Sequence, residues 1–171
     1  MGIRKGLIIL GDLSDQDLIW MAKAGHVRKL ADGDALITEG RDIQDIFFIT
    51  DGKFDVTVQG QHIAQLDVGD VMGEMSFVEK RPPFATVSAK GPARVLAVPR
   101  QMLLEHFRND QGFAARFYRA LAVFLSDRLR SMAPGEEADE LDEGLLDTIH
   151  VAGDRMLRLI DLLEGRMLQN S

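Results

Sequence analysis

Short apolar stretches separated by turn residues fill the chain between residues 26 and 100. Some of these stretches alternate apolar and polar side chains, as half-buried strands do, and others are continuous apolar runs typical of buried strands. Asp51-Gly52 is a hairpin signal between two of them. About eight short strands at this spacing predict an antiparallel sandwich or barrel. The main expected strands cover residues 27–30, 36–38, 46–50, 54–58, 63–66, 85–89 and 94–98.

A helical pattern precedes the strands. Ser14 followed by Asp17 forms a capping-box-like start, in which each residue can bond to the other's backbone. Apolar residues then form a stripe, and Gly25 is a suitable end. The pattern therefore predicts a helix over residues 12–25.

Two further helices are expected after the strands. Pro99 ends the last strand, and residues 101–107 form a short apolar-faced helix. Asp110 can cap a longer helix that continues to Arg130. Its apolar residues recur at steps of three, four or five and form one stripe: Phe113, Phe117, Ala120, Leu121, Phe124 and Leu129.

The C-terminal part reads as a linker and a last helix. Residues 132–140 contain the breaker Pro134-Gly135 and begin an acidic run, for which a metal site is conceivable but partners of a helix dipole are the ordinary explanation. Residues 141–169 predict an amphipathic helix for dimerisation or another interaction, packed on its own domain or on a partner chain. Apolar residues recur along it at alternating intervals of four and three residues, which gives a coiled-coil-like apolar seam: Leu145, Ile149, Ala152, Met156, Leu159 and Leu163.

Composition narrows the classes of function. With 171 residues, 46% of them hydrophobic, the chain can build one ordinary domain with a core. A net charge of -7 argues against a broad grip on nucleic acid or an anionic membrane. The chain has no cysteine, so thiolate metal sites and cysteine nucleophiles are excluded. No apolar run has membrane-spanning length and no targeting segment is evident, so we expect a cytoplasmic protein.

Residues 71–87, VMGEMSFVEKRPPFATV, carry the most specific chemistry. Gly73 has no Cβ and lets the backbone come close to a ligand. Met75 and the residues after it can form one turn of helix, whose first N–H groups would suit an anion. Glu74 beside them could accept a hydrogen bond from a sugar hydroxyl, or it could stabilise the turn by accepting from backbone N–H groups.

This stretch closely resembles the phosphate-binding cassette of cyclic nucleotide-binding domains, the family of catabolite activator proteins and protein kinase A regulatory subunits. The spacing fits the family pattern without a gap, and the resemblance covers residues 12–131. It implies an α+β fold: an antiparallel, jelly-roll-like β-roll with a helix before it and the family's B and C helices after it. The matching positions are Gly73, Glu74, Met75, Ser76, Phe77, Pro82, Ala85, Thr86 and Val87.

Two residues depart from the family pattern. Pro83 stands where the family has its phosphate-binding arginine, and Phe84 stands at a small-residue position. Arg81 could supply the missing charge or could be a solvated loop residue. Phe84 could stack on a base, but we expect its ring to fill the site. The candidate ligand site comprises Gly73, Glu74, Met75, Ser76, Arg81, Pro83, Phe84 and Ala85.

The resemblance implies a regulatory protein of signal transduction that binds cAMP or cGMP, here weakly. No nucleophile with its base is recognisable, so we expect no enzyme. The residues after the C helix do not suit a DNA-binding domain, so the output would be contact with proteins, through a homodimer or through a partner of the C-terminal helix. The alternative is a degenerate, non-binding domain that acts as a dimerisation or scaffold module.

Overall fold

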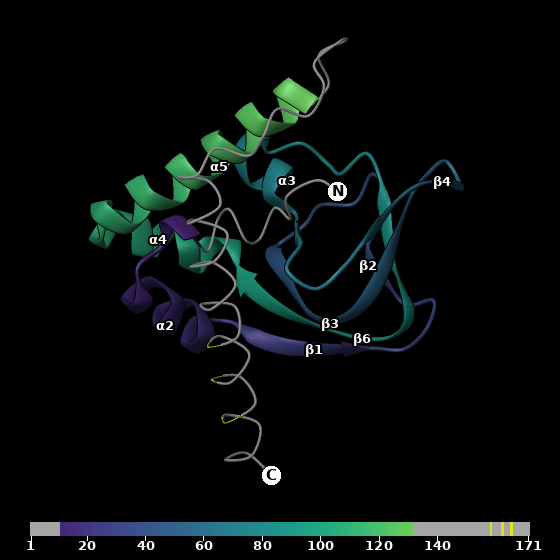
Figure 1. Cartoon of the computed structure of the whole chain (residues 1–171), viewed down its shortest axis with the longest axis horizontal. Coiled ribbons are helices and arrows are strands. Elements are labelled where there is room, and N and C mark those ends of the chain that lie inside the picture. The colour runs from purple at the N-terminus through teal and green to yellow at the C-terminus, as the bar shows by residue number, and fades with distance from the viewer. Residues whose placement is uncertain (1–10, 132–157, 159–161, 163–164, 166–171) are drawn as a thin grey trace. The chain divides into compact units, whose positions relative to one another are not determined.

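The computed structural model describes residues 11–131 and, beyond them, Arg158, Leu162 and Gly165 (Figure 1). The expected linker and most of the expected C-terminal helix therefore lie outside the described residues, although these three are helical. The chain divides into two compact units. One contains the described strands and spans Met21–His106. The other combines Met1–Trp20 with Phe107–Ser171, and its described part is mostly helical, so it is called the helical unit.

The strand-containing unit is built on one antiparallel sheet in the order β1-β6-β3-β4 (Figure 1). In addition, β2 pairs with β6 and β5 pairs with β3. In this order β1 and β4 do not pair with each other. The described strands therefore form an open sheet and not the closed barrel that strand spacing alone allowed. The strands are β1 His26–Leu30, β2 Ala35–Ile37, β3 Asp45–Val58, β4 Gln61–Leu66, β5 Val71–Met72 and β6 Thr86–Pro99.

The hairpin predicted at Asp51-Gly52 is wrong. Both halves of β3 pair with the same partner, β6, so the chain runs straight through this position. The register shifts on both sides of Asp51, and Gly52 has a φ of 85°. Gly52 stands opposite residues 91–93, because Asp51 pairs with Arg94 and Lys53 with Lys90. The bulge beside Gly52 is therefore in β6, and β3 continues without reversing.

Residues 85–89 and 94–98 were also expected as separate strands, and the structure joins them in β6. Gly91, with a φ of 80°, lies between the two halves, and the residues around it remain paired or extended. Four expected strands thus become two long ones. The seven listed strands are thereby reduced to five, and the short β5, which was not among them, makes the sixth strand of the described chain.

The inner face of the sheet carries an apolar cluster contributed by all strands except β4. Ile49, Phe54 and Val95 are fully buried in it. Side chains alternate between the two faces of a strand, so Phe47 and Ile49 lie inside while Ile46 and Phe48 face the other way. The cluster consists of Leu30, Leu36, Ile37, Phe47, Ile49, Phe54, Met72, Val87, Ala89, Ala93, Val95 and Ala97.

The expected flanking helices are confirmed. Helix α2 covers Asp15–Ala24, α4 covers Arg100–Asn109 and α5 covers Gln111–Ser131. The predicted caps are present, because the backbone N–H of Phe113 donates to Asp110 Oδ1 at 2.9 Å, and that of Asp17 donates to Ser14 Oγ at 3.2 Å. The antiparallel sheet with flanking helices is the fold class that the sequence predicted.

The described part of the apolar stripe of α5 is buried. Phe113 and Phe117 are fully buried. The ring of Phe113 makes edge contacts with Trp20 and Phe107, at centroid distances of 5.6 and 5.3 Å. Phe113 and Phe117 are therefore buried within one chain, and the predicted homodimer does not depend on them. The side chain of Phe124 lies outside the description.

Candidate functional site

The cassette joins β5 to β6 through α3, which covers Glu74–Glu79 and confirms the helical turn predicted there. Gly73 precedes α3 with φ 87° and ψ 0°, in the left-handed region. A Cβ at this position would lie 3.0 Å from the carbonyl oxygen of Asp45 on β3. Both the conformation and the close approach therefore require glycine.

Helix α3 closes tightly at both ends. The N–H of Phe77 donates to the Gly73 carbonyl at 3.1 Å, and the N–H of Lys80 donates to the Ser76 carbonyl at 3.2 Å. Lys80 itself has a φ of 52°, a left-handed cap that is unusual for a residue with a side chain. The N–H groups of the first turn have no partner within the helix, as at any helix start.

Two polar side chains of the cassette are buried. Glu74 is 5% exposed and Ser76 is 8% exposed, whereas Met75 between them is exposed. Burying a carboxylate is costly unless it is hydrogen-bonded, and Glu74 is not without an interaction partner. Glu74 therefore has the placement that both readings of the sequence require: an acceptor held at the start of α3.

The cassette exit is tied to the loop between β2 and β3. The N–H of Gly40 donates to the Pro83 carbonyl at 2.9 Å, and the N–H of Glu39 donates to Thr86 Oγ1 at 3.1 Å. The carboxylate of Glu39 also accepts from the N–H of Gln59 at 3.1 Å. Glu39 and Gly40 thus connect the cassette exit to the turn after β3. Sequence reasoning missed this role, because these contacts join residues far apart in the chain.

The ring of Phe84 does not fill the site, so that prediction is wrong. Phe84 is 56% exposed, while the next residue, Ala85, is buried. Both residues lie in a bend just before β6, which begins at Thr86. The exposure of Phe84 shows that its ring points outward, while the small Ala85 is turned inward.

No positive charge is buried in the cassette. Pro83 is half-buried and carries none, and Lys80 and Arg81 are exposed. The cassette therefore brings together the glycine, the buried glutamate and the short helix, but not the arginine of the family pattern. Arg81 keeps the solvated environment that was one of its two sequence readings.

Neither a metal site nor a membrane span is found in the described part of the chain. Its histidine, aspartate and glutamate side chains form no group of three that could hold a metal ion. None of its helices is both long and apolar enough to cross a membrane. His150, the acidic run and the seam of the C-terminal helix lie outside the described residues.

Comparison with known proteins agrees with this geometry. The family model of the cyclic nucleotide-binding domain matches residues 27–110, which include the whole cassette. The chain is 36% identical over 88 residues to the Pycsar effector protein PaPycTIR of Pseudomonas aeruginosa, over 50% of this chain and 29% of that protein. It is 32% identical over 96 residues to a cAMP-dependent protein kinase regulatory subunit of Yarrowia lipolytica, over 55% of this chain and 26% of that one. The chain thus spans less than a third of either relative.

Solved structures share the fold. A cyclic nucleotide-binding domain from Methylobacillus flagellatus superimposes with a TM-score of 0.66 at 22% identity, over 74% of this chain and 78% of that one. The catabolite activator protein of Thermus thermophilus gives 0.62 at 18% identity, over 93% and 87%. The family model thus identifies residues 27–110 as a cyclic nucleotide-binding domain, and the sheet, the cassette and the solved structures agree with its fold.

Proposed function

We propose that this chain is a regulatory module that binds a cyclic nucleotide weakly at the cassette and passes the signal on through protein contacts. The observation that carries the proposal is the start of α3, where a left-handed Gly73 and a buried Glu74 are held against β3. The cAMP-dependent kinase regulatory subunits among the relatives support the ligand class. A soluble cytoplasmic location fits this role.

The binding is weak because Pro83 leaves the cyclic phosphate without its arginine. An arginine paired with a buried phosphate contributes ~1.5–3 kcal/mol. The loss of this contact raises the dissociation constant roughly 10–150-fold. We therefore expect calorimetry with cAMP and cGMP to give high-micromolar constants or weaker.

The matching test restores the charge. Pro83→Arg should tighten cAMP binding by about 10–150-fold. Because the ring of Phe84 points outward, this single substitution should suffice without Phe84→Ala. Lys53→Arg, at an exposed lysine on β3, is the control and should leave the affinity unchanged. A sub-micromolar constant for the unaltered protein would contradict the role given to Pro83.

Arg81→Ala separates the two readings of Arg81. If Arg81 turns inward when a ligand binds, this variant loses the residual binding of the unaltered protein. If Arg81 remains solvated, the affinity does not change.

The second candidate is a domain that has lost ligand binding and acts as a scaffold. Two observations favour it. The cassette has no buried cation to pair with a phosphate, and the hydrogen bond from Gly40 to the Pro83 carbonyl can hold the loop in place without a ligand. Calorimetry distinguishes the two functions. A folded Pro83→Arg variant that binds none of cAMP, cGMP or cyclic dinucleotides would favour the scaffold.

A further inference from the structure

Strand β1 forms one edge of the sheet (Figure 1). Its five residues pair with β6 alone, from His26 opposite Ala97 to Leu30 opposite Ala93. No other strand in the described part of the chain pairs with the opposite side of β1. The outward-facing backbone N–H and C=O groups of such an edge are a template for another strand.

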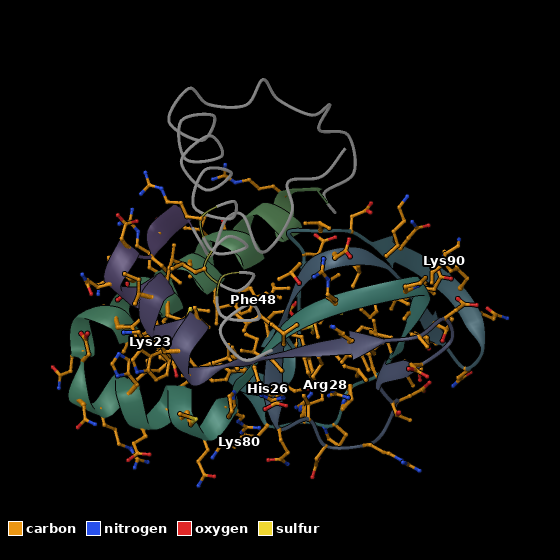
Figure 2. The ribbon with its side chains drawn as sticks, turned by 90° about the horizontal axis from the view of Figure 1, so that it is seen from below. Lys23, His26, Arg28, Phe48, Lys80 and Lys90 are labelled. Carbon is orange, nitrogen blue, oxygen red and sulfur yellow. The ribbon has the colours of Figure 1, made fainter. Side chains whose placement is uncertain are left out.

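This edge is basic, although the chain as a whole has a net charge of -7. Lys23, at the end of α2, is followed by His26, Arg28 and Lys29, and residues 18–31 contain no acidic side chain. Lys23, Arg28 and Lys29 make no ion pair with the described residues. Figure 2 shows Lys23, His26 and Arg28 in sequence along this edge.

The cations occupy both faces of the edge. Arg28 lies on the inner face, and its guanidinium carbon is 5.8 Å from the centroid of the buried Phe47 ring. This cation–π contact holds the half-buried guanidinium in one place. Lys29 points to the opposite face and is exposed. A strand laid beside β1 would therefore meet a positive side chain whichever way its own side chains point.

We propose that the β1 edge binds an extended acidic peptide of a partner protein as an added strand. Lysines on an edge discourage pairing with a second copy of the same edge, because like charges would face each other. The same charges attract a strand of opposite sign. In strand addition the main-chain hydrogen bonds supply affinity and the alternating side chains supply specificity. None of these cations is a cassette residue, so the inference goes beyond the proposed ligand binding.

The test uses the full chain and a fluorescently labelled, acetylated peptide in which glutamate and valine alternate. Fluorescence polarisation should show saturable binding that weakens as salt is raised. Lys29→Glu should weaken it roughly threefold to tenfold, and Arg28→Glu should also weaken it. Because Arg28 is half-buried, circular dichroism must show that its variant folds, and the exposed Lys29 keeps the test valid if it does not. Lys53→Glu reverses an exposed charge on another strand and should have no effect.

A second peptide distinguishes strand addition from plain charge attraction. N-methylation of alternate backbone nitrogens removes donors without changing the charge, so it should abolish binding if the peptide pairs with β1. Equal binding of the methylated peptide, or equal competition by inorganic polyphosphate, would overturn the proposal in favour of generic anion attraction. Absence of binding at low salt, or binding unchanged by Lys29→Glu, would also overturn it and leave the cations as protection of the edge.

Discussion

A single carboxylate, Asp17, joins two helices of the helical unit that are 99 residues apart in sequence. Its two oxygens accept from Arg116 Nε at 2.7 Å and from Arg116 Nη2 at 2.9 Å. One of these oxygens also accepts from the N–H of Ser14 at 2.8 Å, which completes the reciprocal cap of α2. Asp17 is 3% exposed. Bidentate, charge-assisted hydrogen bonds of this kind stabilise the contact and also fix the orientation of the two side chains.

The pKa of Asp17 makes this contact sensitive to acid. Burial alone would raise the pKa of Asp17, but the hydrogen bonds from Arg116 and Ser14 outweigh burial and lower it below the ordinary value of 3.8. A carboxylate with a lowered folded-state pKa stabilises the fold above its unfolded-state pKa. That stability is lost as the pH falls through the folded-state value.

We therefore predict that Asp17→Asn lowers the free energy of unfolding by about 2 kcal/mol at pH 7, through the lost ion pair and cap. The difference between variant and unaltered protein should shrink as the pH falls below about 4. Urea denaturation at several pH values measures both effects. Asp15→Asn, at a neighbouring exposed position, should change stability by less than about 0.5 kcal/mol. A loss that stays constant down to pH 3 would contradict the ionic explanation.

Among the strands, the long β3 shows why local signals were misread. Asp51-Gly52 meets the local requirement of a tight turn, since glycine readily adopts a positive φ. The same conformation also fits a shift of register inside a continuous strand, and only the common partner β6 distinguishes the two. That pairing is a long-range contact and leaves no trace in the neighbouring residues. By contrast, the capping residues Ser14 and Asp110 act within their own turn, so the helix starts were predictable.

The bulge gives a stability prediction for β3. A Cβ on residue 52 would lie 2.7 Å from the carbonyl oxygen of Pro92 and 2.8 Å from Ala93, in addition to the strain of φ 85°. Gly52→Ala should therefore cost more than the ~1–2 kcal/mol of left-handed strain alone. Gly60→Ala is the matched control, because Gly60 has a φ of 79° but nothing within 4 Å of its added Cβ. Thermal unfolding should rank Gly52→Ala well below Gly60→Ala, and equal melting temperatures would count against the clash.

For the complete chain, the sequence predicted the sheet, the flanking helices and the cassette, because turn glycines, caps and an ungapped motif are local features. The tie from Glu39 and Gly40 to Thr86 and Pro83 was not predictable from local features. The outward position of Phe84 was missed for a different reason. Its chemistry suggested a filler, but the direction of the side chain is set by the bend at residues 84 and 85, which buries Ala85 and exposes Phe84.

Assembly is the remaining prediction. Phe113 and Phe117 are already buried within one chain. The expectation of a homodimer therefore rests on two other features. The first is the exposed Tyr118 and Val123 on α5, which are 45% and 37% exposed. The second is the apolar seam of residues 141–169, which lies outside the described residues. A stable pair would be expected to bury roughly 1,200 Å² or more in total.

Light scattering at high micromolar concentration should give about twice the chain mass of 19.0 kDa. Val123→Glu should shift the protein toward monomer if α5 forms the interface, because it places a charge in a desolvated apolar contact. Leu159→Glu should do so if the terminal helix forms it, since this residue lies on the seam. Lys53→Glu reverses an exposed charge on β3 and should leave the mass unchanged. A mass near 19.0 kDa for the unaltered protein at that concentration would show that neither surface forms a stable homodimer.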